Sequence, residues 1–147
     1  MHKLFQYIID YLFPPSHIEL IIRDLPIDWL IHYAPLASIP EFTFINSLYD
    51  YKNEIIKELI WQIKYRKNKR AIEIASYALY KYLTNTCKEK VILIPIPISK
   101  ERRKERGFNQ CELLIDEIIR LDIEKRFEKD YEILERIKDI EKQTFKD

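Results

Sequence analysis

The residues best suited to bind a ligand follow an apolar segment in the middle of the chain. The segment 91–94 is short, continuous and β-branched, as buried strands are. Pro95 and Pro97 must end it, because proline has no N–H for a ladder. A basic run follows and stops at Gly107. The cations that we assign to a site are Lys100, Arg102, Arg103 and Arg106. Ligands of open α/β sheets bind at the carboxyl ends of strands, so this order predicts a cation-rich loop that captures an anion.

Gly107 is the only glycine among 147 residues, whereas average usage would give roughly ten. A glycine kept in such a chain indicates a backbone that needs positive φ or close approach to another group. The simpler alternative is an ordinary loop glycine before a helix. The basic run has an alternative too, because its cations alternate with Glu101 and Glu105 as on a solvated helical surface.

Two further groups of polar residues bear on function. Phe108, Asn109 and Gln110 follow the glycine, and Asn109 is a good helix N-cap, so we favour a structural role for the two amides over substrate contact. The second group is a basic cluster interrupted by Tyr65, a combination that could track a nucleic-acid backbone. With one aromatic residue it is better explained as a solvated turn. The cluster consists of Lys64, Arg66, Lys67, Lys69 and Arg70.

Composition limits the other possibilities. The length fits one domain, or one domain with a small appendage, and 47 % hydrophobic residues are enough for a core. A net charge of +1 implies neither a nucleic-acid nor a membrane partner in bulk. Cys87 and Cys111 form no CxxC pair, which argues against a thiolate zinc site and a disulfide framework and favours a reducing cytoplasm. The histidines lack metal-ligand spacing, and no basis exists for assigning acid–base roles to the carboxylates after Gln110.

The hydrophobic periodicity predicts a mixed α/β chain. Helices are expected over Leu4–Phe13, over Ile18–Arg23 with Ser16 as cap, and as a turn within Asp28–Leu36. Further helices are expected from Asp50 or Asn53 to Tyr65, from Arg70 to Asn85, and from Asn109 to Leu121. Strands are expected at Glu41–Leu48, Val91–Ile94 and Tyr131–Leu134, the last two parallel. The first helices lack the cationic face of membrane-surface helices, so we expect no membrane partner.

The proline-containing segment and the residues around Gly107 resemble those of a known family. Ile94-Pro95-Ile96-Pro97 followed by Arg106-Gly107-Phe108-Asn109-Gln110 resembles the ComF family, competence-associated proteins with a type I phosphoribosyltransferase fold. Weaker matches are Leu12–Pro15, Ser47–Tyr51, Ile63–Arg66, and Leu134–Arg136 with Gln143-Thr144. The resemblance implies a partial type I phosphoribosyltransferase-like, Rossmann-like parallel sheet over residues 41–147. Residues 1–40 would then form an α-helical amino-terminal appendage.

Two departures from the family pattern qualify the expected function. Family members carry a zinc ribbon of CxxC pairs after the FPP motif, but Ser16 to Leu20 contain no cysteine, so the appendage would replace the ribbon and no zinc is expected. The phosphoribosyl-diphosphate signature, two acidic residues and a TTGxT-type loop, is also missing, since no glycine follows Gly107. We therefore expect a truncated core whose sheet is only part-built.

Three functions remain open on the sequence. The first is a non-catalytic binding protein linked to DNA uptake, with phosphoribosyl diphosphate or another phosphate anion, DNA, or a competence helicase as partner. The second is a phosphoribosyltransferase that uses phosphoribosyl diphosphate with Mg²⁺. The third is the amino-terminal fragment of a split or frameshifted gene. The open edge of a part-built sheet also predicts a homodimer or modest solubility.

Overall fold

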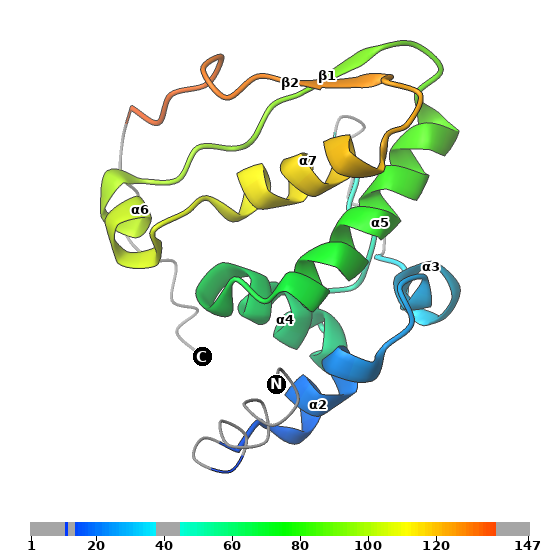
Figure 1. Ribbon diagram of the computed structural model, residues 1–147, viewed down its shortest axis with the longest axis vertical. Coiled ribbons are helices and arrows are strands. Elements are labelled where there is room, and N and C mark those ends of the chain that lie inside the picture. The colour runs from blue at the N-terminus through cyan, green and yellow to red at the C-terminus, as the bar shows by residue number, and fades with distance from the viewer. Residues whose placement is uncertain (1–10, 12–13, 38–44, 138–147) are drawn as a thin grey trace, which may run out of the picture.

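The computed structural model describes residue 11, residues 14–37 and residues 45–137 (Figure 1). Among these residues, strands β1 (Val91–Leu93) and β2 (Phe127–Lys129) form a parallel pair with Val91 opposite Phe127. Helix α7 (Gln110–Leu121) lies between this pair and the long helix α5 (Lys69–Thr86). The predicted α/β character is therefore confirmed at the level of a mixed fold with a small parallel sheet.

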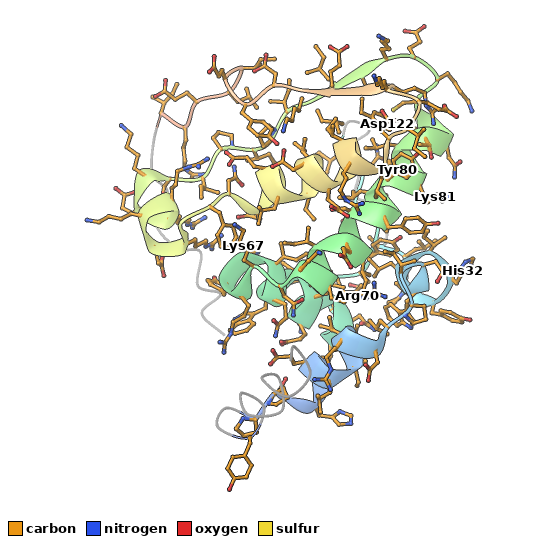
Figure 2. The ribbon with its side chains drawn as sticks, viewed as in Figure 1. His32, Lys67, Arg70, Tyr80, Lys81 and Asp122 are labelled. Carbon is orange, nitrogen blue, oxygen red and sulfur yellow. The ribbon has the colours of Figure 1, made fainter. Side chains whose placement is uncertain are left out.

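The first parallel strand was predicted correctly, but the second lies at 127–129 instead of 131–134. The carboxylate of Asp122 accepts a hydrogen bond from the N–H of Phe127 at 2.7 Å, which closes a tight turn after α7 and brings Phe127 beside Val91. Figure 2 labels Asp122, at the end of α7, and Tyr80, within α5. The buried Phe127 ring meets Tyr80 edge-on at 6.2 Å between centroids. Burial of one aromatic ring, and not an apolar run, selects the strand.

The hydrophobic core lies among the helices. α5 packs against α2 (His17–Asp24), α3 (Trp29–Tyr33) and α4 (Glu54–Trp61) as well as against α7. The buried residues of this core come from helices α2 to α5 and from the segments that connect them: Ile22, Leu25, Leu30, Ile56, Leu59, Ile63, Ala71, Ile74 and Ala78. Helices α2 and α3 thus share a core with α4 and α5, and a domain boundary at residue 40 stays a prediction.

Side-chain caps fix where most of these helices begin. Ser16 accepts a hydrogen bond from the N–H of Glu19, as predicted, and Asn53 rather than Asp50 caps α4. Asn68 caps α5 after Lys67 has taken a left-handed φ of 50°. This turn confirms the predicted break between the two helices. The sequence did not indicate that α4 continues as a π-helix, η1 (Gln62–Arg66).

Two predictions concern segments that the structure covers partly or not at all. The helix expected over 4–13 lies outside the described residues except for residue 11. The strand expected over 41–48 is wrong for its described part, because residues 45–48 carry no strand. The chain there makes an isolated antiparallel bridge between Leu36 and Tyr49 instead. Within the described ranges, no helix is both long and apolar enough to cross a bilayer.

Candidate anion-binding site

A pocket of about 520 Å³ lies beyond the carboxyl ends of β1 and β2. Four segments line it: the proline loop after β1, helix α6 (Lys100–Arg106), the start of α7, and the chain after β2. The lining residues are Pro95, Pro97, Ile98, Lys100, Arg103, Asn109, Glu112, Tyr131, Leu134, Glu135, Arg136 and Ile137. The pocket therefore sits where the sequence placed a ligand site, at the ends of parallel strands.

The predicted cation-rich loop is wrong, because residues 100–106 are helical. Ser99 caps this helix by accepting a hydrogen bond from the N–H of Arg102 at 3.2 Å, and no proline or glycine interrupts the run before Gly107. A helix divides its side chains between faces. Lys100 and Arg103, three residues apart, line the pocket, whereas Arg102 is not among its lining residues. The basic run thus supplies two of its four predicted cations to the pocket.

Arg106 points to a different neighbour. Its guanidinium lies over the ring of Tyr65 in η1, with 4.8 Å from Cζ to the ring centroid. Its terminal nitrogens donate to the amide oxygen of Gln110 at 3.1 Å and to the Tyr65 hydroxyl at 3.4 Å. Arg106 and Gln110 consequently tie α6 to α7 and η1, and Arg106 does not line the pocket.

Gly107 is required for its backbone conformation. Its φ is +78°, and its N–H donates to the carbonyl of Arg103 at 2.8 Å, so it ends α6 as a left-handed cap. The predicted positive φ is confirmed. No other protein atom explains the glycine, because a Cβ built on Gly107 would meet nothing within 4 Å, and a close approach to a bound anion stays a prediction. The glycine reverses the chain from α6 into α7 and so places both helices around the pocket.

Asn109 has the structural role predicted for it. Its side chain is 1 % exposed and makes two hydrogen bonds. The amide oxygen accepts from the N–H of Cys111 at 2.9 Å, which caps α7. The amide nitrogen donates to the carbonyl of Ile96 at 3.0 Å and so fastens the proline loop to the start of α7. One buried side chain therefore fixes two walls of the pocket.

The charged groups of the pocket are partly paired with one another. The guanidinium of Arg103 forms an ion pair with the carboxylate of Glu112, both on the pocket wall. Tyr131 also lines the pocket, and its hydroxyl lies 2.7 Å from the Asp116 carboxylate and 3.3 Å from the carbonyl of Glu112. Burial raises the pKa of Tyr131, and its hydrogen bond to Asp116 adds to that shift, so this hydroxyl stays protonated.

Asp116 is held in its charged form. Burial opposes ionisation, but hydrogen bonds from Lys129 and Tyr131 outweigh it and lower the pKa of Asp116. Nearby, burial raises the pKa of the Cys111 thiol, and a hydrogen bond from the backbone of Ile96 only partly offsets that effect. Cys111 and Cys87 are both free thiols.

The second basic cluster, Lys64 to Arg70, does not act as one unit. Arg70, labelled in Figure 2, donates to the carbonyl of Leu25 at 2.5 Å and pairs with Glu73, which also pairs with Lys69. These two cations therefore stabilise α5 and its contact with α2. Lys64 is half-buried at the π-helix. The remaining two, Arg66 and Lys67, lie beside aromatic rings.

These rings and cations form a surface that we call the cation–aromatic surface. Arg66 lies 5.4 Å from the ring centroid of Trp61, and Trp61 lies 5.6 Å from Tyr65, centroid to centroid. Lys67, labelled in Figure 2, lies 5.7 Å from the ring of Phe108. Its members are Trp61, Tyr65, Arg66, Lys67, Arg106 and Phe108. The sequence indicated Tyr65 beside the basic cluster, and the fold brings Trp61 and Phe108 to the same surface.

Sequence reasoning missed four charged or polar residues of the pocket: Glu112, Tyr131, Glu135 and Arg136. Tyr131 and Arg136 follow β2, so the rule about carboxyl ends of strands would have indicated them if the strand had been placed at 127–129. Glu112 had no comparable indication, because its pairing with Arg103 depends on the angle between α6 and α7. The described residues include no group of three or more histidines, cysteines or carboxylates placed to hold a metal ion.

Comparisons with known proteins agree with the resemblance. No protein-family model matches the chain, and no solved structure matches it. The chain is 35 % identical over 93 residues to competence protein ComFC of Bacillus subtilis (strain 168). The match covers 57 % of this chain and 38 % of that protein, so the chain spans well under half of its length. This similarity supports a ComF-like relationship.

Proposed function

We propose that this chain is a ComF-like, competence-associated protein of the cytoplasm that binds a phosphate anion without catalysing phosphoribosyl transfer. The observation that carries the proposal is the pocket at the carboxyl ends of the parallel strands, with Lys100 and Arg103 on its wall. Arginine pairs with phosphate oxygens bidentately and lysine adds a point charge, so the two suit a diphosphate. Phosphoribosyl diphosphate is the ligand that the family resemblance implies.

We propose the absence of catalysis only for residues 1–147 by themselves. Wrapping a 5-phosphate with backbone N–H groups calls for a glycine-rich loop, and the chain has no glycine after Gly107. The phosphoribosyltransferase-type fold is likewise a proposal, supported by the parallel pair and the proline loop. Transfer from phosphoribosyl diphosphate, with Mg²⁺ carried by the diphosphate, is the alternative.

Calorimetric titration tests the pocket. We expect phosphoribosyl diphosphate and inorganic diphosphate to bind, and Arg103→Ala to weaken both by about tenfold, because a hydrogen bond to a charged group is worth about 1.5–3 kcal/mol. The matched control is Arg102→Ala, which removes the same charge from the same helix outside the pocket. Equal weakening by both variants, or no binding by the parent chain, would refute an anion site here. Release of diphosphate on addition of a nucleobase acceptor would favour the enzyme.

A second candidate function, binding of single-stranded DNA, is favoured by the cation–aromatic surface. Trp61 is 41 % exposed and Tyr65 is 50 % exposed, and both have a cation against the ring. Stacking on aromatic rings beside backbone-neutralising cations is how sequence-tolerant single-strand binders work. The overall charge of +1 gives no general attraction, so this local arrangement alone supports the proposal.

Fluorescence anisotropy with an oligothymidylate of about 15 nucleotides tests this second function. We expect Tyr65→Ala to lower affinity about tenfold, since stacking is worth about 1–3 kcal/mol per base. Tyr33→Ala serves as control, because Tyr33 is an exposed aromatic residue on α3. An unchanged affinity in Tyr65→Ala would contradict the surface, and a requirement for added helicase would favour an indirect role.

Dimerisation stays a proposal as well. Every second residue from 92 to 96 is an exposed isoleucine: Ile92, Ile94 and Ile96. The exposed fraction of Ile92 is 53 %. Parallel sheets are ordinarily covered on both faces, so such a stripe favours association. Sedimentation of the parent chain and of Ile92→Lys tests it, and a parent chain that stays monomeric at all concentrations would contradict it.

A further inference from the structure

We propose that Glu112 is an internal competitor for the anion that the pocket binds. In the structure its carboxylate holds the guanidinium of Arg103, and an anion must take Arg103 from Glu112 in order to bind. This inference rests on the proposed function, because it concerns the same pocket. It adds a regulation of affinity that neither the resemblance nor the comparisons imply.

The two side chains differ in freedom. Arg103 is a long side chain, 52 % exposed, on a helix of seven residues with no buried residue. The side chain of Glu112 is 21 % exposed and stands in the first turn of α7, a helix that packs on α5 and is capped by buried Asn109. The carbonyl of Glu112 also meets the Tyr131 hydroxyl. The carboxylate is therefore the fixed member of the pair, and the guanidinium is the member that can turn toward a ligand.

The competition sets a threshold for ligands. A tethered carboxylate acts at an effective concentration in the millimolar range or above, so a free carboxylate of the same chemistry gains little by replacing it. A diphosphate carries more charge and more oxygens, and it can engage Arg103 and Lys100 together. An ion pair this exposed is worth only a little in water, so a diphosphate can break it. Glu112 thereby favours phosphate ligands over carboxylates at Arg103.

The test is a titration of inorganic diphosphate into the full chain at fixed ionic strength. Glu112→Gln should bind about fivefold more tightly than the parent, which is about 1 kcal/mol at 1.4 kcal/mol per tenfold. Glu117→Gln is the matched control, because it removes one negative charge from the same helix, where Glu117 pairs with Arg120 outside the pocket. The control should bind diphosphate as the parent does.

A double-mutant comparison separates competition from a change in packing. In an Arg103→Ala background the Glu112 carboxylate has no guanidinium to pair with. Glu112→Gln should therefore alter diphosphate affinity there no more than Glu117→Gln does. An equal gain with and without Arg103 would overturn the inference. If Glu112→Gln unfolds, Glu112→Asp keeps the charge and withdraws the carboxylate by one methylene, and it should also tighten binding.

The outcomes also separate this inference from the proposed function. If the parent binds diphosphate and Glu112→Gln binds it equally or more weakly, the competitor is refuted and the pocket stands. If the parent binds diphosphate weakly and Glu112→Gln binds it about fivefold more tightly, both the pocket and the competitor are supported. If neither chain binds, the anion site itself fails and the competitor fails with it.

Discussion

Replacing Asn109 by alanine should destabilise the protein measurably, because one side chain joins two segments. The amide oxygen caps α7 through the N–H of Cys111, and loss of an N-cap costs about 1 kcal/mol. The amide nitrogen holds the carbonyl of Ile96, and a hydrogen bond of this kind contributes about 0.5–1.5 kcal/mol. We therefore expect Asn109→Ala to lower the free energy of unfolding by about 2 kcal/mol. For a chain of this size that corresponds to about 4–8 °C in Tm.

Urea unfolding followed by far-UV circular dichroism measures this loss, and two variants interpret it. Asn109→Ser keeps a capping oxygen and removes the donor to Ile96 without burying a charge, so it should lose about half as much. Asn46→Ala removes an exposed amide and should stay within about 0.5 kcal/mol of the parent. A loss in Asn109→Ala no greater than that of Asn46→Ala would refute the reasoning. Because Asn109 also lines the pocket, its loss should weaken diphosphate binding as well.

Three further predictions follow from single positions. Gly107→Ala should cost about 1–2 kcal/mol because of its positive φ, and Gly107→Asn should cost less in the same urea assay; equal losses would contradict the strain argument. In Cys87→Ala, the remaining thiol at Cys111 should react with iodoacetamide more slowly in the native than in the urea-unfolded chain, since its raised pKa leaves less thiolate; equal rates would contradict this. Asp116 has a lowered pKa, so the stabilisation that it contributes is present above its ordinary pKa of 3.8 and is lost as the pH falls through the lowered pKa of the folded protein. Acid titration of Asp116→Asn should therefore show a shallower loss of stability than that of the parent. An unchanged loss of stability in acid would count against the Lys129 and Tyr131 contacts.

Local chemistry made several features predictable from the sequence. Proline after an apolar run ended β1, an asparagine before a helical pattern capped α7, and the single glycine carried a positive φ. Each depends on a residue's own backbone limits or on hydrogen bonds to its near neighbours. The sequence therefore determined where these elements begin and end, and that a cation-bearing segment follows the strand.

Tertiary packing decided the rest. Phe127 became a strand residue because its ring is buried beside Tyr80, although the apolar pattern lay at 131–134. The basic run folded as α6 and thereby sent Arg103 into the pocket and Arg106 to Tyr65. The pairing of Arg103 with Glu112 depends on where α6 and α7 come to lie against each other. The sequence supplied the charged residues, but only the packing of the helices against the strand pair decided which of them come into contact. Such contacts join residues from different elements, and no periodic pattern in the sequence indicates their pairing.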